Sequence, residues 1–135
     1  MHIRCEGKGK PVTFELTPGE AHDAPLFEKL MEGGAIKRAG RGRPRRLPKR
    51  VAADRGYSSK KIRKYLAVRG IGITIPRKSN EKHKGKFDKE AYRKRNVVER
   101  LINRLKQYRR IATRYEKRAS NYKAFIFIAA ILLWL

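Results

Sequence analysis

Acidic residues are scarce in this chain. Only 12 of its 135 residues are Asp or Glu, against 36 Lys or Arg, and the formal net charge is +24. A surface this positive repels itself, and a polyanionic partner explains it best. Nucleic acid is the first candidate and an anionic membrane surface the second. The third alternative is that the basic surface serves only to keep the protein well solvated and highly soluble.

Cysteine is nearly absent as well. Cys5 stands alone, which excludes an internal disulfide and a cysteine-rich metal cluster, and a free thiol suits a reducing compartment. The three histidines His2, His22 and His83 are scattered, without the spacing of metal ligands. The first ten residues contain no apolar run of the kind that a secretory signal needs, so we expect a cytoplasmic protein.

Long hydrophobic runs are missing except for one, the twelve consecutive apolar residues at 124–135. A helix needs about 20 such residues to span a membrane. We therefore predict no membrane partner and a helix that is buried on most of its sides and closes the core. Phe125 and Trp134 would contribute large buried areas to it. Association with a membrane surface is the alternative.

The rest of the pattern alternates short strands with helices, as expected of one α/β domain over residues 1–135. Strands are predicted at 2–6, 12–16, 51–54 and 71–75, and helices at 24–31, about 58–68, from 88 onward and from about 121. Asp23 and then Ser58 or Ser59 are the predicted N-caps, and Gly70 is the C-cap. The strand–helix–strand order between 51 and 75 implies a parallel crossover. Two basic loops, 37–50 and 77–87, separate these elements.

The helix predicted from residue 88 carries a polar stripe beside an apolar one. An arc of roughly 60° holds the side chains of Tyr92, Arg95, Glu99 and Lys106, because each helical residue advances about 100°. The apolar positions point roughly 110° away; they are Val98, Leu101, Ile102, Leu105 and Tyr108. A carboxylate flanked by cations can hold a divalent metal while its neighbours hold phosphate. The alternatives are a solvated face and an i,i+4 salt bridge from Arg95 to Glu99, worth a few tenths of a kcal/mol.

Asp54 ends the strand predicted at 51–54. It is the single acid between Lys37 and Lys78, a stretch with 16 Lys and Arg residues. A lone carboxylate at a strand end amid so much positive charge is either a metal ligand or the partner in an ion pair or cap.

These two acidic positions carry a resemblance to a known family. The spacing Tyr-x2-Arg-x3-Glu-x6-Lys resembles the Tyr-Arg-Glu-Lys motif of bacterial insertion-sequence transposases of the DDE type. The surrounding sequence of this chain, ERLINRLKQYRRIATRYEK, also resembles that family. The segment at 51–57, VAADRGY, is similar to the surroundings of the family's second catalytic aspartate. The likeness runs along essentially the whole chain.

The resemblance implies a ribonuclease H-like fold, in which helices flank a mixed sheet. It implies that Asp54 and Glu99 are the second and third catalytic carboxylates and hold Mg²⁺ or Mn²⁺. Two such ions would clamp the attacking and leaving oxygens during DNA strand cleavage and transfer. Tyr92, Arg95 and Lys106 would contact backbone or terminal phosphates near the cut.

One part of the family pattern has no counterpart here. The family's first catalytic aspartate lies on a first strand upstream of the predicted hairpin, and Glu6, Glu15 and Glu20 do not match its context. The chain therefore resembles the C-terminal part of such a transposase, with the first strand missing, and we expect little or no activity from it alone. An open sheet edge would invite pairing with an upstream-encoded N-terminal half or a second transposase copy.

The basic loops fit contact with the phosphate backbone of transposon ends and target DNA, which positions DNA without reading sequence. In the first loop the candidate DNA-binding residues are Arg41, Arg43, Arg45 and Arg46. The run Arg-Gly-Arg-Pro at 41–44 resembles an AT-hook-like minor-groove strip, and generic phosphate binding is the broader alternative. A non-catalytic basic nucleic-acid-binding protein is the alternative to a transposase fragment. The two differ because catalysis requires Asp54 and Glu99 to meet at one site.

Overall fold

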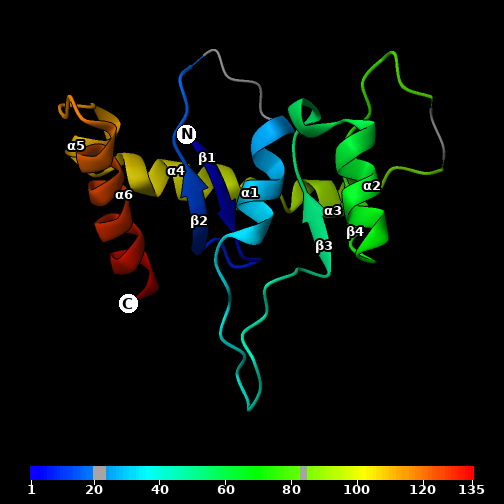
Figure 1. Ribbon diagram of the computed structural model, residues 1–135, viewed down its shortest axis with the longest axis horizontal. Helices are drawn as coiled ribbons and strands as arrows, with labels where there is room; N and C mark the ends of the chain where they lie inside the picture. Colours follow the sequence, from blue (N-terminus) through cyan, green and yellow to red (C-terminus); the bar gives the residue numbers. More distant parts are fainter. Residues whose placement is uncertain (20–23, 83–84) are drawn as a thin grey trace.

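The chain begins with an antiparallel hairpin, β1 (His2–Cys5) and β2 (Pro11–Glu15), in the computed structural model of Figure 1. The structure describes residues 1–19, 24–82 and 85–135. The elements after the hairpin are η1 (Ala24–Leu26), α1 (Phe27–Glu32), β3 (Arg50–Ala52), η2 (Arg55–Tyr57), α2 (Lys60–Val68), β4 (Gly72–Thr74), α3 (Lys89–Arg93), α4 (Asn96–Lys106), α5 (Arg109–Ala112) and α6 (Ala119–Trp134). The α/β class is thus confirmed.

The hairpin turn is held by its own side chains. The carboxylate of Glu6 accepts hydrogen bonds from the backbone N–H groups of Lys8 and Lys10 at 2.8 and 2.9 Å. Gly9 has φ +81°, a conformation that suits glycine. Its carbonyl accepts a hydrogen bond from Arg104 of α4 at 2.8 Å. The predicted hairpin is therefore confirmed, and α4 is tied to its turn.

The parallel crossover is also confirmed, because β3 pairs with β4 in parallel and α2 connects them. Ser59 is the N-cap, and its hydroxyl accepts from the backbone N–H of Ile62 at 3.1 Å. Gly70, with φ +66°, follows the end of α2 and lets the chain turn into β4. The cap predicted at Asp23 lies outside the described residues.

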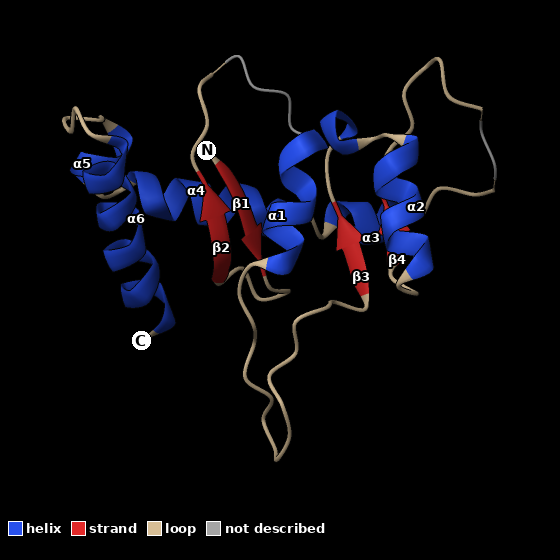
Figure 2. Cartoon of the chain, viewed as in Figure 1, coloured by secondary structure: helices blue, strands red, loops and turns tan. Residues whose placement is uncertain are grey.

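The four strands form two separate two-stranded sheets, β1–β2 and β3–β4 (Figure 2). The mixed sheet that was expected with its first strand missing is divided in two among the described residues, because no strand among them lies between β1 and β3 to join their backbone hydrogen bonds. The core is divided in the same way. One buried cluster lies under β3 and β4 and includes Ile62 and Leu66, and the other lies beside the hairpin and includes Leu101 and Leu105.

The helix expected from residue 88 is interrupted. α3 and α4 are separated at Lys94 and Arg95, where backbone N–H groups bond to the carbonyl three residues earlier. Arg95 N–H donates to Tyr92 at 3.0 Å, and Val98 N–H donates to Arg95 at 2.9 Å. The residues from 93 to 96 are Arg-Lys-Arg-Asn, so this stretch has no apolar side chain to pack into a core and keep a regular α-helix.

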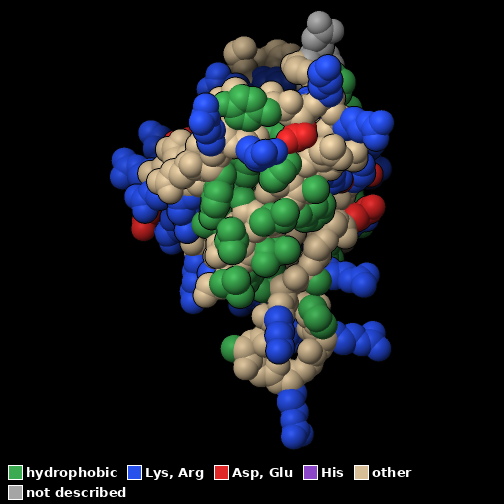
Figure 3. Space-filling model, turned by 90° about the vertical axis from the view of Figure 1, so that its left-hand side faces the viewer, with side chains coloured by type: hydrophobic (Ala, Val, Ile, Leu, Met, Phe, Trp, Pro, Cys, Tyr) green, Lys and Arg blue, Asp and Glu red, His purple; other side chains and the backbone are tan. Residues whose placement is uncertain are grey.

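The prediction that the C-terminal helix is buried on most sides is wrong. α6 buries one stripe, with Ile126 and Ala129 at its centre, against β2, α4 and α5. Six large side chains remain exposed: Phe127, Ile128, Ile131, Leu132, Trp134 and Leu135. Figure 3 shows hydrophobic side chains gathered on this side of the molecule. Within the described residues no helix is both long and apolar enough to cross a membrane.

Candidate active site and basic cleft

A cavity of about 460 Å³ opens between the two sheets. β1 and β3 both line it, α1 contributes Phe27 and Leu30, and α4 contributes Val98 and Ile102. Asp54 and Glu99 also line this cavity, so the fold brings together the two carboxylates that the sequence singled out.

Asp54 lies two residues beyond the end of β3 and caps η2. Its Oδ1 accepts a hydrogen bond from the backbone N–H of Gly56 at 2.9 Å. The side chain is exposed, and none of the ion pairs found among the described residues involves it. The cap that the sequence left open as an alternative is therefore present, and it occupies one carboxylate oxygen.

Glu99 lies one turn into α4 and forms the i,i+4 ion pair with Arg95. The guanidinium Nη2 is 2.7 Å from Oε1 of Glu99. The same guanidinium lies 5.3 Å from the ring centre of Tyr92, and that ring packs on Phe87 at 5.4 Å. Tyr92, Arg95 and Glu99 thus remain in contact despite the break between α3 and α4. The salt bridge does not remove Glu99 from the cavity, because its side chain remains 57% exposed.

The family model for the transposase DDE domain matches residues 1–134. The chain belongs to the DDE transposase family. This family match does not test the Tyr-Arg-Glu-Lys subtype, which stays a prediction.

Two curated relatives agree with this assignment. The DDE domain is 33% identical over 132 residues to a putative transposase for insertion sequence element IS402 from Burkholderia cepacia, across 98% of this chain and 60% of that protein. It is 29% identical over 137 residues to a putative transposase for insertion sequence element IS6501 from Brucella ovis, across 100% of this chain and 96% of that protein. The chain therefore spans 60% of the length of one relative and nearly all of the other. No solved structure matches it.

The carboxylates of the DDE domain were compared with what a divalent metal needs. Within the parts of the chain that the structure describes, no three His, Cys, Asp or Glu side chains are grouped as metal ligands. The shared cavity supplies two carboxylates, Asp54 and Glu99. Mg²⁺ is often held by one or two carboxylates, with water and substrate phosphate completing its coordination. Two carboxylates on one cavity are compatible with such an ion, and they leave most of its coordination to other groups.

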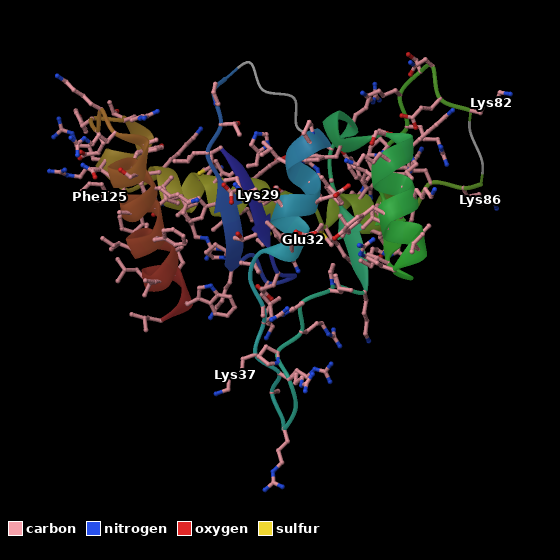
Figure 4. The ribbon with its side chains drawn as sticks, in the orientation of Figure 1. Lys29, Glu32, Lys37, Lys82, Lys86 and Phe125 are labelled. Carbon is pink, nitrogen blue, oxygen red and sulfur yellow. The ribbon has the colours of Figure 1, made fainter. Side chains whose placement is uncertain are left out.

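A second, larger depression of about 1220 Å³ adjoins the cavity at Asp54, which lines both. It is lined by six basic side chains, Arg55, Arg63, Lys64, Arg77, Lys78 and Lys86, and Asp54 is the one acid among the described residues that line it. We call it the basic cleft. Tyr92 lines it too, and Figure 4 shows Lys86 beside α2. The cleft offers a polyanion a route to the carboxylate cavity.

Glu81, which was not singled out from the sequence, contacts two arginines that line this cleft. Glu81 accepts a hydrogen bond from the Ser58 hydroxyl at 3.0 Å and lies 3.5 Å from Nε of Arg63 and 3.7 Å from Arg77. The hydrogen bond from Ser58 lowers the pKa of Glu81, and burial lowers the pKa of Arg63. The sequence signal was an isolated acid inside the second basic loop. Two of its partners, Ser58 and Arg63, are remote in sequence, so spacing did not reveal them.

The remaining predicted site residues lie apart from the cavity. Lys106 is the last residue of α4, exposed and two turns beyond Glu99. The arginines of the first basic loop, at 41, 43, 45 and 46, precede β3, whereas Asp54 follows it. Figure 1 shows that loop projecting below the body while η2 lies above β3. The structure therefore brings Asp54, Glu99, Arg95 and Tyr92 together and leaves these five cations elsewhere.

Proposed function

We propose that this chain is the C-terminal part of a ribonuclease H-like transposase domain, which cleaves and transfers DNA strands with the help of Mg²⁺ or Mn²⁺. Asp54 and Glu99 are the metal-holding carboxylates of that proposal. The observation that carries it is their place on one cavity, beside a cleft lined by six cations. A basic protein that only binds nucleic acid does not require two acidic side chains to meet in this way.

Each neighbouring side chain has a role in this proposal. A divalent ion held there would supply charge stabilisation for the oxygens that attack and leave phosphorus. Arg95 keeps the carboxylate of Glu99 oriented, and Tyr92 supports the guanidinium from behind. The basic cleft and Lys106 bind the sugar–phosphate backbone of transposon ends and target DNA. Such DNA lies in the bacterial nucleoid, so the cytoplasm is the expected place of action.

A third carboxylate is expected from outside the described residues. β1 and β3 each pair with a single strand here, and both line the cavity that separates the two sheets. An extended segment paired with these strands would join the sheets and could place an acid beside Asp54. An N-terminal portion of the transposase, or a second copy, is the proposed source. Two carboxylates alone hold a divalent ion weakly, so we propose that the isolated chain has little or no activity.

The test uses the chain reconstituted with a transposase N-terminal portion that carries the first aspartate. We expect nicking of DNA bearing transposon ends in Mg²⁺ or Mn²⁺, and its loss in Asp54→Asn and Glu99→Gln with DNA binding retained. Glu90→Gln is the matched control, because Glu90 is an exposed acid on α3 outside the cavity. Cutting at the wild-type rate by either cavity variant rejects the assignment.

A further inference from the structure

A narrow basic projection, residues 36–45, extends from the body of the protein (Figures 1 and 3). We call it the finger. Its two limbs are joined where Ile36 and Arg45 exchange backbone hydrogen bonds, at 2.9 Å from Ile36 N–H and 2.8 Å from Arg45 N–H. Lys37 lies on the first limb in Figure 4. The proposed strand-transfer chemistry does not use this part of the chain, which begins on the opposite side of β3 from Asp54.

The base of the finger is fixed by a half-buried arginine of β1. Nη2 of Arg4 donates to the carbonyl of Arg46 at 2.8 Å, directly beyond the second limb. Nη1 of Arg4 donates to the carbonyls of Met31 at 2.8 Å and Gly33 at 3.1 Å, just before the first limb. One guanidinium thus ties both ends of the finger to the hairpin. The fork of donors that does this is specific to arginine.

The first limb also leaves the body through a tight passage. A Cβ added to Gly33 would lie 2.8 Å from Oγ1 of Thr13, and one added to Gly34 would lie 2.7 Å from Cγ1 of Val12. Both distances are shorter than real Cβ contacts, so these glycines let the backbone lie directly on β2. The finger is therefore held at its root by packing as well as by hydrogen bonds, and its tip points in a set direction.

The tip of the finger carries positive charge on a glycine-rich segment with few bulky side chains. The finger holds five Lys and Arg residues and no acid, and none of its cations forms an ion pair with a described residue. From 39 to 44 the chain is Ala-Gly-Arg-Gly-Arg-Pro, so glycines flank Arg41 on both sides and Arg43 lies between a glycine and a proline. All of these residues are exposed. A guanidinium on such a tip can enter a slot that excludes bulkier ends.

The minor groove of DNA is a slot of this size. It is about 6 Å wide and 7.5 Å deep, and it narrows further in A·T-rich runs, where its negative potential attracts arginine. We propose that the finger reads A·T-rich DNA through Arg41 and Arg43 in the minor groove, and that Arg4 is the positioning residue that aims it. The proposal rests on DNA being the partner of this chain. It adds a sequence preference at a place apart from the cut, since the finger precedes β3 whereas Asp54 follows it.

The competing role for the finger is contact with phosphates alone. Phosphate contact is blind to sequence and depends only on charge, so a lysine would serve as well as an arginine. A minor-groove contact prefers A·T over G·C and prefers arginine, whose guanidinium loses its water more easily than an ammonium does. Base composition and the Arg-to-Lys exchange therefore distinguish the two roles.

The test measures the affinity of the whole chain for two duplexes of equal length, one A·T-rich and one G·C-rich, by fluorescence anisotropy at fixed salt. We expect the A·T-rich duplex to bind about tenfold more tightly, a difference of the size that one or two groove contacts produce. Netropsin, which fills the A·T minor groove, should remove the preference. In Arg43→Lys the preference should fall to near one, although the charge is unchanged. Lys37→Ala, the matched control at the finger's base, should weaken both duplexes equally.

The role of Arg4 has its own readout. Arg4→Lys keeps the charge of a half-buried side chain but cannot bond to all of these carbonyls, so the A·T preference should fall while binding to the G·C-rich duplex stays the same. The urea midpoint shows whether this variant remains folded, and if it does not, the exposed tip variant Arg43→Lys decides the proposal. Equal affinity for both duplexes, or a preference that survives Arg43→Lys, overturns it. Failure to bind either duplex at low salt would instead reject DNA as the partner and with it the proposed function.

Discussion

Substitution of Asp54 can separate the shape of the candidate site from its charge. Asp54→Asn keeps an oxygen that can accept the hydrogen bond from the N–H of Gly56, whereas Asp54→Ala removes the acceptor. Loss of a cap to Ala costs ~0.5–2 kcal/mol in general. The lower end applies here, because η2 has three residues and Asp54 is exposed. We therefore expect the free energy of unfolding to fall by about 0.5–1 kcal/mol in Asp54→Ala and by under ~0.3 kcal/mol in Asp54→Asn.

The charge itself contributes little to folding at moderate salt. Both variants raise the formal net charge from +24 to +25, and the added repulsion is spread over an exposed surface that salt screens within about 10 Å. Thermal melts at 0.3 M salt should therefore place Asn within about 1 °C of the wild type and Ala roughly 2–4 °C lower.

Strand cleavage, unlike thermal stability, should be lost in both Asp54 variants. In the reconstituted protein we expect both to lose DNA cutting, because neither an amide nor a methyl group replaces an ionised oxygen on a divalent ion. An equal melting temperature for Asp54→Asn and Asp54→Ala would refute the capping argument. Cutting that survives in Asn but not in Ala would assign Asp54 a structural role and refute the metal-ligand argument.

Three further outcomes are expected. Lys106→Ala should flatten the slope of log affinity for DNA against log salt by about one, while Gln107→Ala leaves it unchanged; equal slopes count against a phosphate contact. The hydrogen bond from Ser58 lowers the pKa of Glu81. The ionised carboxylate therefore stabilises the fold above its ordinary pKa of 4.5, and this contribution is lost as the pH falls through its pKa in the folded protein. The urea midpoints of wild type and Glu81→Gln should then converge below pH 4.5, and a constant gap contradicts this. Burial raises the pKa of Cys5 to about 11 from 9.0, so iodoacetamide at pH 8 should alkylate it about 100-fold more slowly than in the urea-unfolded chain, and equal rates would contradict the burial.

The elements that the sequence predicted well are those with local chemical signals. Ser59 caps α2 and Gly70 follows its end, and these two residues bound the crossover without reference to the rest of the fold. The expected meeting of Asp54 and Glu99 also agrees with the cavity they share, although their catalytic role stays a prediction. Local patterns placed Glu99 on its helix and Asp54 close behind a strand, two residues beyond the observed end of β3.

Features that depend on what packs against them were not predictable in this way. Twelve apolar residues indicated a buried helix, yet Phe127 is 50% and Ile131 59% exposed because the described neighbours cover one face of α6 only. The anchoring of the finger depends on Arg4, 32 positions before the first limb begins at Ile36. The network around Glu81 joins residues up to 23 positions apart. Periodicity describes one element at a time and does not contain these contacts.

Trp134 gives the molecule a built-in optical reporter. It is the only tryptophan in the chain, its indole N–H donates to the carbonyl of Pro11 at 2.6 Å, and Lys10 lies 4.9 Å from its ring centre. Its emission spectrum therefore records whether the C-terminal end of α6 stays seated on the hairpin. Since this contact is remote in the chain from Asp54 and Glu99, a cavity variant that keeps the wild-type emission spectrum has kept α6 on the hairpin, and this can be checked before any DNA is added.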